Sequence, residues 1–418
     1  MSENGVSRRY EFIVVVLLSL AFGFEFLDRL AMSFLLPIIQ PELNITNAQI
    51  GLLGFINTGC YSLSAIVFGY IQDKTGGRKK WLVFWLFATF VATAVTAMVS
   101  SFGQLFVVRA FVGIVEGPLL GLFGVILIHT NPKNFGRNMG ITNSAVALIA
   151  VTLGPIAVTQ MVRFFSWQST YFLVAVPTLI IAILCAIFIK EVHIDPEEAI
   201  KQKQQLVQAG GVMSLFKNKN IIVCIFFSIA LFGGYWTMML FAPLYLVNVT
   251  GYSVQQMGFI SSTMGIIFII HCTLIPKLSD VFGRKPILII ASVCAVMPPL
   301  LMAVFPGSLI STIAYVLLAG TMAALPPVIS NVVPMESVVE YLRTTANGVI
   351  SGLGEFLGGS CMPVVVGRVA DSQGLQATMG VGAALLFLNI IFGALLKETN
   401  PVVLAKQAEK QKQQQAGA

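Results

Sequence analysis

Long apolar stretches alternate with short polar segments along almost the whole chain. Each stretch holds about 20 predominantly apolar residues, enough for a helix to cross roughly 30 Å of hydrocarbon at about 1.5 Å per residue. Twelve such stretches can be delimited, at residues 12–37, 46–71, 82–100, 105–128, 139–160, 170–190, 221–248, 256–276, 287–305, 311–333, 345–367 and 376–396. The pattern predicts an all-α integral membrane protein with twelve transmembrane helices.

The composition of the chain excludes a water-soluble protein. Apolar residues make up 56% of its 418 residues and charged residues only 10%, too few polar side chains to cover a soluble surface. The net charge of +7 does not indicate nucleic acid binding, because 21 of the 25 Lys and Arg residues face one side of the membrane if the amino terminus is cytoplasmic. The positive-inside rule therefore predicts a multi-pass protein with both termini cytoplasmic, which we expect in the plasma (cell inner) membrane.

The longest polar interruption divides the chain into two sets of six stretches. We expect a cytoplasmic amino terminus at 1–11, a six-helix bundle at 12–190, a cytoplasmic linker at 191–220, a second six-helix bundle at 221–396 and a cytoplasmic tail at 397–418. Two loops, after the second and the eighth stretch, repeat an Asp-x-x-Gly element at Asp73 and Asp280, 207 residues apart. Parallel repeats of six helices are a known transporter plan, so two pseudo-symmetric bundles are predicted.

Five charged residues lie inside the first and fourth stretches. Arg29 and Arg109 are accompanied at helical spacing by three carboxylates, Glu25, Asp28 and Glu116. An arginine at the centre of a bilayer costs about 2.5 to 3.5 kcal/mol on insertion scales, so such residues usually face a bundle interior or a water-filled path. The pattern favours a transporter of charged solutes over the alternative of a permanent ion-paired set that only fixes helix packing.

The loop after the second stretch carries a family motif. The run Gly69-x-x-x-Asp73-Lys74-x-Gly76-x-Arg78 resembles the signature loop of the major facilitator superfamily, and a weaker copy contains Asp280, Gly283 and Arg284. The copy departs from the pattern at Pro276 and Val281. The resemblance implies the major facilitator fold and a latch at the cytoplasmic gate, formed by Gly69, Asp73, Gly76, Arg78, Asp280, Gly283 and Arg284. The basic residues of the loop also have a simpler explanation as topology signals.

Within that superfamily, the charged residues of the first and fourth stretches are similar to the anion:cation symporter family, which includes bacterial sugar-acid carriers, sialin and the vesicular glutamate transporters. The similarity rests on the Asp28-Arg29 pair and on Arg109-x-x-x-Gly-x-x-Glu116-Gly. It implies that Arg29 grips the substrate's carboxylate through a bidentate fork. It also implies that Asp28 and Glu116 carry protons and that Arg109 holds Glu116 ionised. Glu25 is a further proton-coupling candidate or a helical partner of Arg29.

Glu355 lies about halfway along the eleventh stretch, among glycines and with no basic residue near it in sequence. It is a candidate to bind a substrate hydroxyl or amino group or to carry a second proton, and a protonated, hydrogen-bonded core residue is the equal alternative. Tyr61, Tyr235 and Trp236 are candidates to line a substrate cavity, although single aromatic residues in helices more often belong to the core.

These observations predict a secondary active transporter that moves a small organic acid anion, such as a monocarboxylate, a sugar acid or an aromatic acid, by proton symport with alternating access. The expected partners are the organic acid, protons and membrane lipid, with no nucleic acid; the resemblance implies a monomer. No cofactor is expected besides the proton gradient, and no metal, because the six cysteines lie singly without metal-binding spacing.

Two other functions compete with this prediction. A proton-coupled drug or cation exporter of the same fold would use Glu25 and Glu355 as cation sites but would not ordinarily need Arg29. An intramembrane enzyme would need a metal cluster or a nucleophile with its base, and the sequence has no HExxH or GxSxG spacing. The chain is therefore not expected to be an enzyme.

Overall fold

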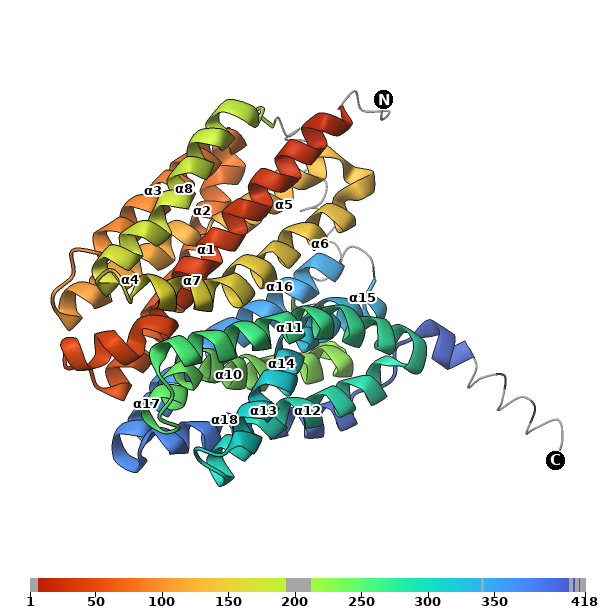
Figure 1. Ribbon diagram of the computed structural model, residues 1–418. Helices are drawn as coiled ribbons and strands as arrows, with labels where there is room; N and C mark the ends of the chain where they lie inside the picture. Colours follow the sequence, from red (N-terminus) through yellow and green to blue (C-terminus); the bar gives the residue numbers. More distant parts are fainter. Residues whose placement is uncertain (1–6, 193–211, 340–341, 406–408, 410–412, 414–418) are drawn as a thin grey trace. The chain divides into compact units, whose positions relative to one another are not determined.

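The computed structural model describes residues 7–192, 212–339 and 342–405, together with residues 409 and 413. All regular structure in these residues is helical (Figure 1). Within the described ranges, 12 helical segments are long and apolar enough to cross a membrane. The predicted all-α fold class and the twelve crossings are confirmed, and the protein is a multi-pass membrane protein.

The first six crossings are formed by eight α-helices. They are α1 (Arg8–Glu42), α2 (Asn47–Thr75), α3 (Arg78–Thr96), α4 (Phe102–Glu116) with α5 (Leu119–Thr130), α6 (Phe135–Val146) with α7 (Gly154–Met161), and α8 (Trp167–Phe188). Side-chain caps explain several helix starts: Ser7 accepts from the amide of Tyr10, and Thr46 and Gln49 form a reciprocal capping box. A short 3-10 turn, η1 (Pro132–Asn134), precedes α6.

The last six crossings follow a 3-10 segment, η3 (Val212–Lys217). They are α10 (Lys219–Asn248), α11 (Val254–Phe282), α12 (Arg284–Val304), α13 (Leu309–Leu318) with α14 (Gly320–Pro326) and α15 (Val333–Ser337), α16 (Arg343–Leu353) with α17 (Met362–Gln373), and α18 (Leu375–Leu395). Most of the predicted 191–220 linker lies outside the described residues, so its role as a domain boundary stays a prediction.

Three crossings contain a π-helical segment in which the hydrogen-bond register widens. These segments are η2 (Ala147–Leu153) in the fifth crossing, η4 (Pro327–Val332) in the tenth and η6 (Gly354–Cys361) in the eleventh. Pro326 and Pro327 lie at the start of η4. Because a proline nitrogen carries no hydrogen, it cannot donate a hydrogen bond to a carbonyl of the preceding turn. Such segments are frequent at functional sites, and η6 carries Glu355.

The described residues form two compact units. The first comprises the first six crossings together with residues 239–266 and 363–376, and the second comprises 267–362 with the described residues of 212–238 and of the chain from 377 onward. Inside the first unit, α1 packs on α6, η2 and α8, while α3 packs on α8 and α2 on α4 (Figure 1). The helix α1 is thus surrounded on several sides, which buries Glu25 and Asp28 in its middle.

Residues from the second half of the sequence complete the first unit. The carboxylate of Asp371, near the end of α17, accepts hydrogen bonds from the amides of Asn47 and Ala48 at 2.8 and 2.9 Å. These are the first two residues of α2, where backbone amides have no partner within the helix and the helix dipole favours a negative charge. Gly367 lies so close to Asn47 that a Cβ atom there would overlap its carbonyl. Helix α17 therefore caps and holds the first turn of α2.

Candidate functional site

The guanidinium of Arg29, on α1, is bound by two carboxylates within the first unit. Its Nη2 donates to Oε2 of Glu116 at 2.9 Å, and its Nε donates to the same oxygen at 3.3 Å. Nη2 also donates to Oε1 of Glu25, one turn earlier on α1, at 3.5 Å. The aromatic rings of Tyr61 and Phe26 lie 4.3 and 5.1 Å from its central carbon, as in cation–π contacts. The structure therefore brings the predicted residues Arg29, Glu25, Glu116 and Tyr61 into one cluster.

The second arginine, Arg109 on α4, lies beside Asp28 with 4.0 Å between Nη2 and Oδ1. Nη2 donates to the hydroxyl of Thr96 on α3 at 3.4 Å, and the guanidinium lies 5.0 Å from the ring centre of Tyr171 on α8. Both side chains of the ion pair are buried, at 3% relative exposure each. Thr96 and Tyr171 orient this arginine, and the sequence reading did not identify either of them.

Close packing of α4 on α2 sets the positions of Arg109 and Glu116. A Cβ atom at Gly113 would overlap the carbonyl of Asn57, and one at Gly117 would overlap the carbonyl of Tyr61. The side-chain amide of Asn57 donates to the carbonyl of Arg109 at 3.2 Å. Glycines four residues apart form one flat strip on a helix, so this spacing lets the two backbones meet and fixes the rotation of α4.

Arg109 is predicted to hold Glu116 ionised, and this role stays a prediction, because the described residues show no direct ion pair between the two side chains. The two residues lie on one helix, about 10.5 Å apart along its axis. Each acts instead across the interface with α1: Glu116 binds Arg29, and Arg109 faces Asp28. The structure thus brings the five predicted charged residues together in the first unit, with contacts that run between α1 and α4.

In the second unit, Glu355 is held by an indole. Nε1 of Trp236 on α10 donates to Oε2 of Glu355 at 2.7 Å, and the rings of Tyr235 and Trp236 meet edge to face with centroids 5.5 Å apart. Gly354 and Gly358 place η6 against α10, where a Cβ atom at Gly358 would overlap the carbonyl of Ile229. Three of the predicted substrate-binding residues, Tyr235, Trp236 and Glu355, therefore form a second local cluster.

The predicted gate loop forms a tight turn between α2 and α3. Gly76 and Gly77 have φ values of 65° and 67°, a left-handed conformation that favours glycine, and a Cβ atom at Gly69 would meet nothing. Arg78 begins α3 and is buried at 5% exposure. The side chain of Asp73 falls outside what the structure describes, so its role as a latch stays a prediction.

The second copy of the loop is organised around Arg284. Its guanidinium binds Asp280, and it also binds Glu336 of α15, with Nη2 2.8 Å from Oε1. Gly283 supplies the turn with a φ of 105°. Glu336 was missed by the sequence reading because it lies 52 residues from its partner in an unremarkable polar context.

A repeated helix cap was also missed. Glu398 accepts from the amides of Arg284 and Lys285 at 2.9 and 3.1 Å, and Glu191 accepts from the amide of Lys79 at 3.0 Å. Both carboxylates cap the start of a helix that follows a gate loop. Glu191 and Glu398 are 207 residues apart, the same offset as Asp73 and Asp280, and this repetition is the signal that could have identified them.

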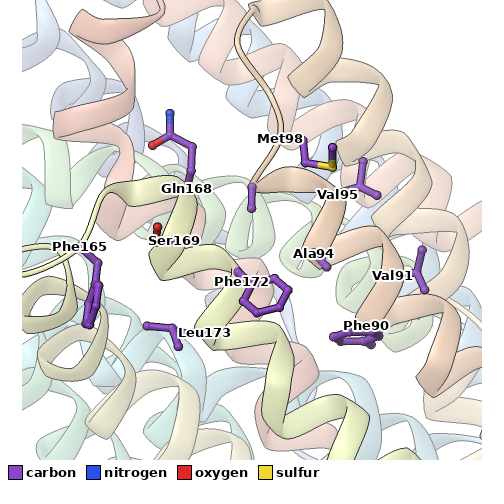
Figure 2. A pocket seen from close by; sticks show the side chains of 11 residues that line it. Phe90, Val91, Ala94, Val95, Met98, Phe165, Gln168, Ser169, Phe172 and Leu173 are labelled. Atoms are coloured by element: carbon purple, nitrogen blue, oxygen red, sulfur yellow. The ribbon is translucent and has the colours of Figure 1, made fainter.

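Among the residues the structure describes, no group of three or more His, Cys, Asp or Glu side chains could hold a metal ion. A groove of about 630 Å³ lies between α3 and α8 (Figure 2). Its lining is mostly apolar, with Phe90, Val95, Met98 and Phe172 along it and Gln168 and Ser169 as its polar members. None of the predicted site residues lines it, and an apolar groove on membrane-crossing helices suits lipid chains rather than a charged solute.

Comparison with known proteins identifies relatives of the whole fold. The family model described as Major Facilitator Superfamily matches residues 18–360. The hexuronate transporter of Bacillus subtilis is 29% identical over 258 residues, 59% of this chain and 59% of that protein, so the match spans less than two thirds of that relative. The sialic acid transporter NanX of Escherichia coli is 22% identical over 90% of each chain.

The solved structures agree on the architecture. A crystal structure of a bacterial homolog of the human lysosomal transporter Spinster, in an inward-facing and occupied conformation, matches with a TM-score of 0.77 at 16% identity, covering 93% of this chain and 97% of that chain. At this level of identity the likeness extends to the fold alone.

Proposed function

This chain belongs to the major facilitator superfamily, whose members are transporters and not enzymes, and from that premise we propose that it moves a small organic acid anion across the membrane by proton symport. The observation that carries the proposal is the state of Arg29: a guanidinium surrounded by membrane-crossing helices, bound on one edge by Glu116 and still 11% exposed along its side chain. A guanidinium offers a planar fork that matches a carboxylate.

The proposed substrate class is a monocarboxylate, a sugar acid or an aromatic acid. Proteins named for hexuronate and sialic acid transport are similar to this chain, and both of those solutes carry a carboxylate and hydroxyl groups. Arg29 would bind the carboxylate, with the ring of Tyr61 beside the guanidinium. Glu355, with Oε2 held by Trp236, would accept a hydrogen bond from a substrate hydroxyl or amino group, and Tyr235 and Trp236 would contact its apolar surface.

Proton coupling is assigned to the carboxylates of the Arg29 cluster. Glu25, Asp28 and Glu116 are all buried, and a buried carboxylate can change between an arginine-bound charged form and a neutral protonated form. Each charge state favours a different arrangement of α1 against α4, so proton binding can shift the balance between conformations of an alternating-access cycle. Arg109 would serve the same purpose for Asp28.

The proposed setting follows from the charge distribution of the sequence. The protein would reside in the plasma membrane with both termini in the cytoplasm, as a monomer surrounded by lipid, and would use the proton gradient without a cofactor. The loop residues around Arg78 and Arg284 would form the cytoplasmic gate, with Asp73 as the latch.

A proton-coupled exporter of drugs or other cations is the second candidate. The cluster of Glu355 with Trp236 and Tyr235 supports it, because a carboxylate flanked by aromatic rings suits an organic cation. Arg29 counts against it, since a carrier of organic cations would not ordinarily need a guanidinium among its membrane-crossing helices. Transport of acids and of cationic dyes under the same pH gradient separates the two functions.

The test uses purified protein in two assays. A thermal-shift screen of D-glucuronate, L-galactonate, N-acetylneuraminate, benzoate and amino acids would find the acid that binds, and uptake of that labelled acid into proteoliposomes would follow an imposed inward proton gradient. We expect Arg29→Ala to abolish binding and uptake, and Arg29→Lys to weaken both, because an ammonium lacks the planar fork. Unchanged acid binding by Arg29→Ala would contradict the proposal, as would uptake of cationic dyes without uptake of any acid.

A further inference from the structure

We infer that Glu25 is the carboxylate that the substrate displaces from Arg29, and that Glu25 takes up one proton as it leaves. This inference rests on the proposed function, since it concerns the site where Arg29 would bind an organic acid. It assigns the substrate-linked proton to a residue one helical turn before Arg29 on α1, and it predicts that a monocarboxylate and a proton bind together.

The two carboxylates hold Arg29 unequally. Glu116 accepts from both Nε and Nη2, at 3.3 and 2.9 Å, and so occupies the side edge of the guanidinium. Glu25 reaches only Nη2, at 3.5 Å, the outer limit for a hydrogen bond. Glu25 is therefore the more weakly bound of the two and the first to be exchanged.

The edge of the guanidinium formed by Nη1 and Nη2 also indicates that Glu25 is the carboxylate to be displaced. No described side chain accepts a hydrogen bond from Nη1 of Arg29, and the side chain is 11% exposed. An incoming carboxylate that binds end-on uses one N–H of Nη1 and one of Nη2. Because Glu116 occupies the side edge, the N–H of Nη2 left for the substrate is the one that Glu25 uses. End-on binding thus requires Glu25 to leave while Glu116 stays.

The charge of the cluster makes proton uptake a consequence of this displacement. Three carboxylates face two guanidinium groups, which leaves one negative charge in excess. The charged side chains that act on Glu25 are Glu116 of α4 and Arg29 and Asp28 of α1. Beyond them, Tyr61 of α2 lies against Arg29, Arg109 of α4 lies beside Asp28, and Tyr171 of α8 lies against Arg109. A substrate carboxylate would bring a second excess negative charge into a site where a buried, unpaired charge is costly.

Glu25 is the group placed to accept the compensating proton. Its side chain is 0% exposed, and its Oε2 has no hydrogen-bond partner in the described structure. Once it has lost Arg29, the ionised form would be buried and unpaired. In the balanced step the Glu25 carboxylate gains one proton and becomes a neutral carboxyl group, while the substrate carboxylate takes its place on Arg29. The bound monoanion and the proton together add no net charge.

The step has a defined pH dependence. Binding that takes up one proton becomes stronger as the pH falls, and above the pH at which free Glu25 ionises the affinity decreases about tenfold per pH unit. A dicarboxylate would bring one more negative charge than the single proton compensates, so it would bind more weakly than a monocarboxylate of similar size.

Calorimetry counts the proton directly. The probe is whichever of D-glucuronate, L-galactonate or N-acetylneuraminate binds most tightly to the wild-type protein, titrated in buffers with different ionisation enthalpies. We expect about one proton taken up per ligand by the wild-type protein. Glu25→Gln should bind the same acid with no proton uptake and with an affinity that no longer changes with pH. Glu11→Gln is the matched control: Glu11 is a buried carboxylate on the same helix, bound by Asn134, Asn138 and Arg137, and its loss should leave the uptake intact.

A second measurement, made on the wild-type protein, tests the inference if the Glu25→Gln variant does not fold. The infrared difference spectrum of wild-type protein with isotope-labelled glutamate should gain a protonated carboxyl band from Glu when the probe binds, and no such band would overturn the inference. Proton uptake that persists in folded Glu25→Gln, with binding still lost in Arg29→Ala, would overturn this inference and leave the proposed function standing. Failure of every probe to bind the wild-type protein, or binding unaffected by Arg29→Ala, would overturn both.

Discussion

Asp28 lies beside Arg109 in the interior of the first unit, with 4.0 Å between the nearest oxygen and nitrogen atoms, and neither of its carboxylate oxygens accepts a hydrogen bond from a described residue. The pair is close enough for strong attraction in a low-dielectric interior but lacks the bonds of a fixed structural ion pair. A carboxylate that no hydrogen bond fixes in place can separate from its arginine more readily than one that is fully hydrogen-bonded.

We therefore predict that Asp28→Asn separates exchange from accumulation. Asparagine has nearly the same shape as a protonated aspartate but cannot release a proton, so the variant should still exchange labelled for unlabelled acid across proteoliposomes. It should not concentrate the acid when an inward proton gradient is imposed. Accumulation equal to that of the wild-type protein would exclude Asp28 as a coupling residue.

Glu116→Gln tests the partner that stays on Arg29. Glutamine keeps an oxygen that accepts from Nη2 of Arg29 but removes the negative charge and one proton-carrying carboxylate, so acid binding should persist and proton-driven accumulation should decrease. The measurement is uptake of the acid identified in the thermal-shift screen, with and without the proton gradient. Because the inference assigns the substrate-linked proton to Glu25, this variant should still take up a proton when the acid binds in calorimetry. Full accumulation by Glu116→Gln would remove Glu116 from the coupling mechanism.

The fold was largely predictable from the sequence. A helix must be about 20 apolar residues long to cross a bilayer, so runs of this length in the sequence identify the transmembrane helices. The ends of the helices were less accurate: the fifth crossing, predicted at 139–160, covers Pro132–Met161. Polar residues such as Arg137 and Asn138 extend that helix beyond the apolar core, where hydrogen bonds to Glu11 satisfy them. The π-helical register of η6 was not predicted, since local hydrogen-bond shifts leave no periodic signature.

The membership of the charged cluster was predictable, but its pairing was not. An arginine inside an apolar run is informative by itself, because few positions in a membrane protein tolerate one. Which carboxylate it meets depends on how each helix is rotated about its axis. For α4 that rotation is set by the contact of Gly113 and Gly117 with α2, a relationship between helices that spacing along one helix does not contain.

Gly117→Val tests that packing directly. A Cβ atom at Gly117 would overlap Ser64 and the carbonyl of Tyr61, so α4 and α2 must separate, and overpacking of this kind costs about 1 to 3 kcal/mol. We expect a lower melting temperature in detergent and a loss of acid binding, since the movement carries Glu116 away from Arg29. Gly121→Ala, on α5, is the control because a Cβ atom there meets nothing within 4 Å. A Gly117→Val protein that melts and binds like the wild type would show that this contact does not position the site.

Trp236→Phe tests the second cluster. The substitution keeps an aromatic ring but removes the N–H that donates to Oε2 of Glu355 at 2.7 Å, so the carboxylate loses this positioning bond. If Glu355 binds a substrate hydroxyl, a misplaced carboxylate should weaken binding of a hydroxylated acid by about 1.4 kcal/mol, or tenfold in KM. Benzoate, which has no hydroxyl group, should be transported with an unchanged KM.

Uptake of D-glucuronate and benzoate would be compared in the same proteoliposomes, with Glu355→Gln as the companion variant. An equal rise in KM for both acids would mean that Trp236 only supports the packing of α10, and an unchanged KM for D-glucuronate in Glu355→Gln would remove Glu355 from substrate recognition.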